Sequence, residues 1–113
     1  MTGETLKTIR DVHQLFTEKK LRLSVAESCT GGLISHYLTW FSGSSKFFES
    51  GVVTYSVLSK ENILGISSET IAFHGVISSE TAKEMAEKMR LQSGTDYALS
   101  ITGNLGPDVL EGK

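Results

Sequence analysis

The chain has 113 residues, a length that suits one domain and is too short for two. Hydrophobic residues make up 39% and charged residues 21% of the sequence, as in an ordinary globular domain with its own core. The net charge is -2 and no segment concentrates Lys or Arg, so the sequence lacks the electrostatic footprint of a nucleic-acid-binding protein. The single cysteine excludes an internal disulfide, and without a signal region or a long apolar run the expected location is cytoplasmic and away from membranes.

The first predicted element is a helix that begins near the N-terminus. Thr2 or Thr5 can cap it. Its apolar residues recur at spacings of three and four and therefore share one face: Leu6, Ile9, Val12 and Phe16. Apolar and polar residues then alternate over residues 21–26, which predicts a short strand.

A polar turn over residues 27–32 separates this strand from the next predicted helix, residues 33–40. A second strand is predicted over residues 51–55, which include β-branched side chains. Residues 60–64 are expected to form a short helical turn that ends at Gly65.

The last predicted elements are a long helix and a third strand. The helix begins after Ser78 or Ser79, ends at Gly94 and buries one face, made of Ala82, Met85, Ala86 and Met89. The strand covers residues 97–101 and opens into a loop over residues 102–107. Strands that alternate with helices predict an α/β fold with a largely parallel sheet.

The turn after the first predicted strand is a candidate site. Ser28 stands at the sheet edge where open α/β proteins bind ligands. Gly31 and Gly32 let the backbone approach a ligand, and the following helix offers unpaired N–H groups to a phosphate or an oxyanion. The pattern matches neither a P-loop nor a nucleophile elbow, so the simpler interpretation of the spacing is a turn in which Ser28 or Thr30 caps the helix. Cys29 is interpreted as a structural residue rather than a reactive thiol.

Polar residues also follow the other two predicted strands, at the same edge of the sheet. Tyr55 ends the second strand, and Lys60 lies in the short helix after it. A lysine in a desolvated cleft can act as the general base for a serine, although a solvated lysine and a packed tyrosine are the simpler alternative. Thr102 and Gly103 follow the third strand and can line the same pocket. The three histidines have no metal-ligand spacing.

Several segments together carry a resemblance to a known family. They run in unbroken order from about Leu21 to Pro107: Ala26-Glu27-Ser28-Cys29-Thr30-Gly31-Gly32, Gly43-Ser44-Ser45, Gly51-Val52-Val53-Thr54-Tyr55-Ser56, Lys60, Gly75-Val76-Ile77-Ser78, Met85-Ala86 and Thr102-Gly103-x-x-Gly106-Pro107. Each segment alone is a weak signal, whereas their joint occurrence is specific. On these residues the chain resembles the CinA C-terminal domain family.

The resemblance implies one domain over residues 1–113, a three-layer α/β/α sandwich with a mixed, largely parallel sheet, and a homo-oligomer. It also implies a nicotinamide-nucleotide amidase, which hydrolyses the carboxamide of nicotinamide mononucleotide to nicotinate mononucleotide and ammonia without a cofactor or metal. In this family Ser28 corresponds to the nucleophile, and Lys60 and Tyr55 to its proton-transfer partners. The segments that line the family's pocket match Thr30, Gly31, Gly32, Thr102 and Gly103.

In the implied mechanism Lys60 takes the proton of Ser28, directly or through Tyr55, and amides of the glycine loops hold the oxyanion. The sequence departs from the family at Val57, where asparagine is frequent, and at Asn104-Leu105. Family domains usually continue further, so the last strands of the family fold are expected to be missing. Two alternatives stay open: a non-catalytic nucleotide-binding or structural remnant, and an unrelated phosphate-binding module.

Overall fold

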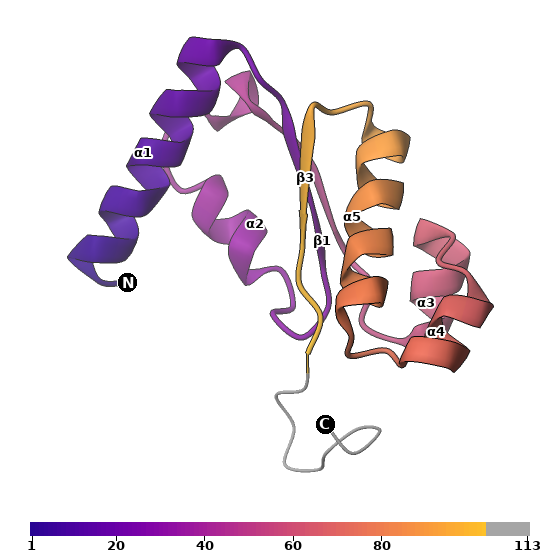
Figure 1. Ribbon diagram of the computed structural model, residues 1–113. Helices are drawn as coiled ribbons and strands as arrows, with labels where there is room; N and C mark the ends of the chain where they lie inside the picture. The colour runs from indigo at the N-terminus through magenta and orange to yellow at the C-terminus, as the bar shows by residue number, and fades with distance from the viewer. Residues whose placement is uncertain (104–113) are drawn as a thin grey trace.

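A three-stranded β-sheet lies between two layers of helices in the computed structural model, which describes residues 1–103 (Figure 1). Helices α1 and α2 cover one face of the sheet, and α3, α4 and α5 lie on the other. In chain order the elements are α1 (Gly3–Lys19), β1 (Leu23–Glu27), α2 (Leu33–Leu38), the 3-10 turn η1 (Ser44–Lys46), β2 (Phe48–Val53), α3 (Val57–Ser59), the π-helical turn η2 (Lys60–Leu64), α4 (Ser68–His74), α5 (Ser79–Ser93) and β3 (Tyr97–Ser100). The predicted α/β fold with helices on both faces of the sheet is confirmed.

Strand β1 is the centre of the sheet, with β2 and β3 on either side of it. Both pairings are parallel: Leu23 of β1 faces Phe48 of β2 and Tyr97 of β3. All five residues of β1 are buried because helices cover both faces of a central parallel strand. Since the strands are parallel, the segments that follow them meet at one edge, the lower edge of the sheet in Figure 1.

The two long helices begin and end as their sequences predict. Thr2 is the cap of α1, and its hydroxyl oxygen accepts from the main-chain N–H of Thr5 at 3.1 Å. Ser78 caps α5 in the same way, through the N–H of Thr81 at 3.1 Å. Gly94 then ends α5 with a φ of 68°, a left-handed conformation that glycine adopts without strain.

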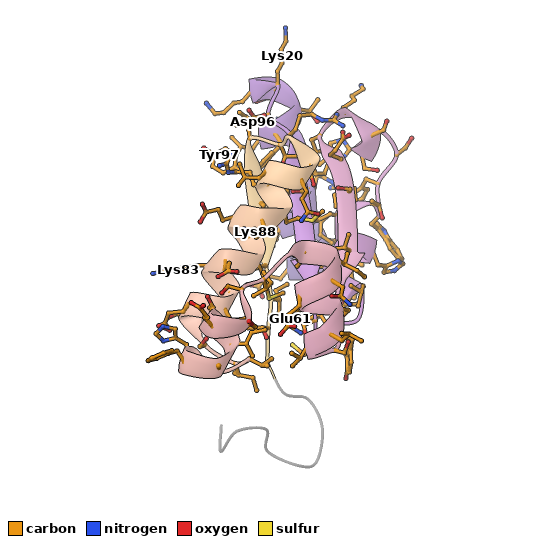
Figure 2. All side chains as sticks on the ribbon, turned by 90° about the vertical axis from the view of Figure 1, so that its right-hand side faces the viewer. Lys20, Glu61, Lys83, Lys88, Asp96 and Tyr97 are labelled. Carbon is orange, nitrogen blue, oxygen red and sulfur yellow. The ribbon has the colours of Figure 1, made fainter. Side chains whose placement is uncertain are left out.

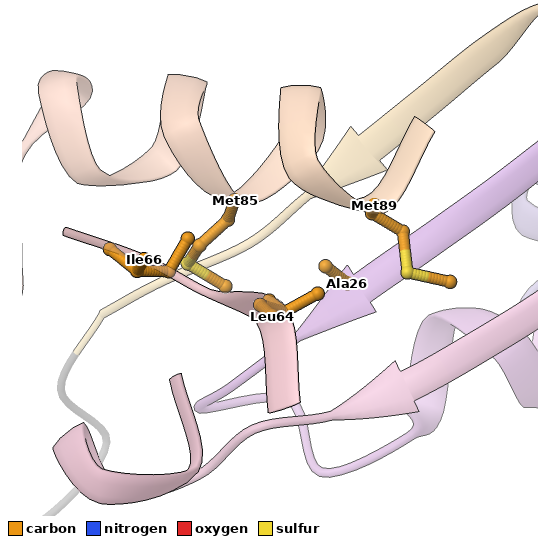
Figure 3. Packing of buried hydrophobic residues seen from close by; sticks show 5 residues of the cluster. All are labelled: Ala26, Leu64, Ile66, Met85 and Met89. Atoms are coloured by element: carbon orange, nitrogen blue, oxygen red, sulfur yellow. The ribbon is translucent and has the colours of Figure 1, made fainter. Parts of the chain in front are cut away.

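Buried side chains form one cluster on each face of the sheet. Because side chains alternate along a strand, Ala26 of β1 faces the cluster under α5, whereas Leu23 and Val25 face α1 and α2. Figure 3 shows the first cluster, in which Met85 and Met89 of α5 lie against Leu64 and Ile66. The second cluster consists of Leu23, Val25, Leu38 and Phe47. Leu64 is fully buried, so the first cluster anchors the end of η2, the turn that begins at Lys60.

The outer side of the layer formed by α3, α4 and α5 carries both charged and exposed apolar side chains, among them Phe73 of α4 and Leu91 of α5. In Figure 2, which faces this layer, Lys83 and Lys88 lie on the side of α5 away from the sheet, and Glu61 lies on the neighbouring η2 turn. Over residues 1–103 no helix combines the length and apolar character needed to cross a membrane. The structure contains one copy of the chain, so the homo-oligomer expected from the sequence stays a prediction.

Candidate active site

Ser28 and Lys60 meet at the edge of the sheet where β1 and β2 end. Ser28 directly follows β1 and is 4% exposed, and Lys60 is the first residue of η2 and is fully buried. The Lys60 Nζ lies 2.9 Å from the Ser28 Oγ, within hydrogen-bond distance. The same Nζ donates to the carbonyl oxygen of Thr54 at 2.8 Å, and the carbonyl of Tyr55 lies 3.5 Å away. These main-chain oxygens fix the direction in which the amine points at Ser28.

Burial lowers the pKa of Lys60, because the charged ammonium loses its hydration shell; the negative charge that Cys29 can carry opposes this effect. Within residues 1–103 no carboxylate forms an ion pair with Lys60, and its amine contacts the hydroxyl of Ser28 and the carbonyl groups of Thr54 and Tyr55. The surroundings therefore favour the neutral amine more than a solvent-exposed site does. A neutral amine has a lone pair that can accept the Ser28 proton.

The carboxylate of Glu27, the last residue of β1, organises the turn that carries Ser28. It is fully buried and accepts five hydrogen bonds. Its Oε1 accepts from the Thr30 hydroxyl at 2.6 Å and from the N–H groups of Gly32 and Ile34 at 3.1 and 3.0 Å. Its Oε2 accepts from Ser35, from the N–H at 2.8 Å and from the hydroxyl at 2.7 Å. Burial alone raises the pKa of Glu27, but these hydrogen bonds outweigh it and hold the pKa below its ordinary value.

The amides of the glycine loop are consequently not free to hold an oxyanion, contrary to the expectation from the sequence. The N–H of Gly32 donates to Glu27, and the N–H of Gly31 donates to the carbonyl of Ser28 at 3.0 Å. The two residues directly after Ser28 differ from these glycines: in the described part of the chain, the N–H groups of Cys29 and Thr30 have no hydrogen-bond partner. These two amides are therefore the available donors beside Ser28.

A sequence model of the CinA C-terminal domain matches residues 5–113. The chain belongs to the CinA C-terminal domain family. A CinA-like protein of Syntrophus aciditrophicus is 52% identical over 96 residues, which are 85% of this chain and 23% of that protein. The chain thus spans about a quarter of the length of the relatives that it matches.

Solved structures of the CinA family share the fold of this chain. The competence damage-inducible protein A of Klebsiella pneumoniae superposes with a TM-score of 0.91 at 33% identity, over 95% of this chain and 66% of that one. The competence/damage inducible protein CihA of Agrobacterium tumefaciens gives a TM-score of 0.91 at 38% identity, over 96% of this chain and 66% of that one. This agreement is consistent with the three-layer arrangement described above.

In this CinA domain Tyr55 contacts Lys60 through its main-chain carbonyl and not through its side chain. Its carbonyl lies near the Lys60 Nζ, whereas the residue as a whole is 66% exposed. The phenol makes no hydrogen bond within residues 1–103. A role for the Tyr55 hydroxyl in proton transfer therefore stays a prediction, and the direct contact between Lys60 and Ser28 does not require it.

The loop after β3 lies beside the Ser28 turn. Gly103 is close enough to Cys29 that a Cβ atom at position 103 would lie 3.2 Å from the Cys29 sulfur. The Thr102 hydroxyl donates to the carbonyl of Val76 at 3.1 Å, so it ties this loop to the segment before α5. Three loops thus meet at one edge, as the parallel topology predicts, while the substrate contacts of Thr30, Gly31, Gly32, Thr102 and Gly103 stay predictions.

Two contributors to the site were not identified from the sequence. Thr54 acts through its carbonyl oxygen, and main-chain contacts leave no mark on residue type. The role of Glu27 could have been predicted from its position. A carboxylate between a buried strand and the start of a helix can accept hydrogen bonds from the free N–H groups of that helix.

Other features of the described residues lie away from this chemistry. A hollow of about 370 Å³ opens between α1 and α2, lined by Ile9, Val12, Leu38 and other residues, and it contains neither Ser28 nor Lys60. Among residues 1–103 no three histidine, cysteine or carboxylate side chains are grouped so that they could hold a metal ion. The Ser28–Lys60 pair is therefore the candidate reactive centre.

Proposed function

We propose that this chain is an amidohydrolase that cleaves the carboxamide of nicotinamide mononucleotide, with Ser28 as nucleophile and Lys60 as general base. The observation that carries the proposal is the fully buried Lys60 amine, 2.9 Å from the Ser28 Oγ and without a carboxylate partner in the described residues. Burying an amine costs free energy, so a site that retains one beside a serine is a candidate for serine–lysine chemistry. The substrate is the one that the family resemblance implies.

In the first half of the reaction, the neutral amine of Lys60 accepts the hydroxyl proton as the Ser28 Oγ attacks the carboxamide carbon. The N–H groups of Cys29 and Thr30, which have no hydrogen-bond partner among residues 1–103, are the donors that we assign to the oxyanion. The Lys60 ammonium then gives its proton to the carboxamide nitrogen. The carbon–nitrogen bond breaks, ammonia leaves, and an ester with Ser28 remains.

The second half repeats these steps with water. Lys60 removes a proton from the water molecule that attacks the ester carbon, and it returns this proton to the Ser28 Oγ when the carbon–oxygen bond breaks. The acid product leaves, and the enzyme regains its starting protonation state. The sum is one amide and one water converted to one acid and one ammonia.

The test is ammonia release from nicotinamide mononucleotide by the purified protein and by Ser28→Ala. We expect turnover by the unchanged protein, and a loss of several orders of magnitude in Ser28→Ala with the fold intact, as is typical when a covalent nucleophile is removed. Circular dichroism of both proteins controls for folding. Near-normal turnover by Ser28→Ala would show that Ser28 is not the nucleophile and would contradict the proposal.

A non-catalytic nucleotide-binding module is the second candidate, favoured by the glycines with positive φ at 31 and 32 beside the site. Titration of nicotinamide mononucleotide by calorimetry separates the two. Saturable binding without ammonia release favours the binding module and contradicts the amidase.

A further inference from the structure

Glu27 is connected to both halves of the Ser28–Lys60 pair. It precedes Ser28 in the chain, and its own carbonyl accepts from the N–H of Thr54 at 2.8 Å. The carbonyl of Thr54 in turn accepts from the Lys60 Nζ at 2.8 Å. A closed path of covalent and hydrogen bonds therefore runs from Ser28 through Glu27 and Thr54 to Lys60, and back to the Ser28 Oγ.

The side chain of Glu27 fixes the other end of the same turn. Its carboxylate binds the N–H groups of Gly32, Ile34 and Ser35, which begin α2. The free N–H groups at a helix start can bind an external anion. Here the chain's own carboxylate occupies them, so the start of α2 holds the turn in place and is not left for a substrate phosphate.

We propose that Glu27 is the positioning residue of the proposed amidase: its carboxylate locks the turn after β1, and this lock sets the distance between the Ser28 Oγ and the Lys60 Nζ. The inference rests on the proposed role of Ser28 as nucleophile. It says that a change at Glu27 lowers the reactivity of Ser28 and leaves substrate binding nearly unchanged, because every polar contact of this carboxylate is internal.

The substitution Glu27→Gln tests this with the smallest change of shape. A glutamine presents an NH₂ group where one carboxylate oxygen now accepts hydrogen bonds, so donors such as the N–H of Ser35 lose their partner. The matched control is Glu18→Gln on α1, an exposed carboxylate whose side chain contacts Gln14.

Two readouts separate positioning from mere folding, and both are taken on protein that circular dichroism shows to be folded. The first is the rate at which methanesulfonyl fluoride modifies Ser28, followed by intact mass. The second is the split between kcat and KM for ammonia release. We expect Glu27→Gln to lower both the modification rate and kcat by roughly 10- to 100-fold, as a misplacement of reacting groups does, with KM little changed. Glu18→Gln should match the unchanged protein.

The outcomes distinguish this inference from the proposed function. If the unchanged protein reacts with the sulfonyl fluoride but releases no ammonia, the proposed substrate is wrong and the modification rate still tests Glu27. Folded Glu27→Gln that is modified at the unchanged rate would overturn the inference, and so would an unreactive Ser28 in the unchanged protein.

A milder variant decides the matter if Glu27→Gln does not fold. Ser35→Ala removes the hydroxyl that donates to Oε2 and keeps the main-chain N–H on the same oxygen. We expect a smaller loss in the Ser28 modification rate and in kcat, in the same direction and again without a change in KM. Rates equal to those of the unchanged protein would overturn the inference.

Discussion

Replacing Lys60 by methionine tests the proposed base most directly. The substitution keeps an unbranched apolar stem and removes the amine that lies 2.9 Å from the Ser28 Oγ. Loss of a positioned general base typically lowers kcat by about 10²- to 10⁴-fold. That range corresponds to about 3–5 kcal/mol in activation free energy. Part of the activity should return as the pH rises, because hydroxide ion can then remove the serine proton.

The same substitution has a signature in the pH dependence of stability. Burial lowers the pKa of Lys60 in the folded state, so between that pKa and the ordinary lysine value the unfolded chain binds a proton that the folded chain does not. The free energy of unfolding therefore rises with pH across this window, by up to about 1.4 kcal/mol per pH unit. At pH values below this window Lys60 is protonated in both states, and its contribution to the free energy of unfolding is constant and unfavourable to folding. In Lys60→Met the free energy of unfolding should no longer rise with pH across this window.

The assays are initial rates of ammonia release from nicotinamide mononucleotide over a range of pH, and urea unfolding at the same pH values. Lys83→Met, an exposed lysine on α5, is the matched control for the loss of one positive charge. Lys60→Arg should also be inactive, because a guanidinium keeps its proton at any usable pH. A Lys60→Met protein with unchanged rates and an unchanged alkaline rise in stability would refute the reasoning.

Two further substitutions test neighbouring parts of the site. Tyr55→Phe should reduce kcat far less than Lys60→Met does, because the Tyr55 carbonyl rather than its phenol lies near Lys60; equal losses in the two variants would place the phenol in the proton path. Gly51→Ala puts a Cβ atom 2.2 Å from the Ser35 Oγ, a clash that should cost about 1–3 kcal/mol in the free energy of unfolding. The control is Gly3→Ala, whose new Cβ atom has no neighbour within 4 Å. Thermal unfolding should show a lower melting temperature for Gly51→Ala than for Gly3→Ala, and equal melting temperatures would contradict the predicted clash.

The sequence was sufficient to predict the frame of the molecule. Helical periodicity and caps identified α1 and α5, and the alternation of strands with helices indicated a parallel sheet. A parallel sheet brings the segments after its strands to one edge, so Ser28 and Lys60 were expected at the same end. These features depend on local pattern and on topology, both of which residue types encode.

Element boundaries and one helix depended on packing that the pattern does not record. Strand β2 begins at Phe48 and not at residue 51, because pairing with β1 sets its start. Helix α4 (Ser68–His74) was not predicted, since a short, largely polar segment has no helical periodicity to read.

The chemistry of the site was the least accessible part. A solvated lysine was the simpler expectation for position 60, and what buries it is the packing around η2, including Leu64 against α5. The free amides expected at the start of α2 are occupied by Glu27, a contact made by a side chain that folds back along its own chain. Both outcomes arise from tertiary contacts between residues whose types alone allow several environments.

Because β1 lies at the centre of the sheet, its two strand pairings close loops of different length. Leu23 pairs with Phe48 on one side and with Tyr97 on the other, so the first pairing closes a much shorter loop than the second. By loop-closure entropy the shorter loop is favoured by about 1 kcal/mol. Ser28 and Lys60 belong to the short side, within a single stretch of chain that joins β1 to η2. The two groups that meet at 2.9 Å are thus brought together by the half of the sheet that loses the least chain entropy when it forms.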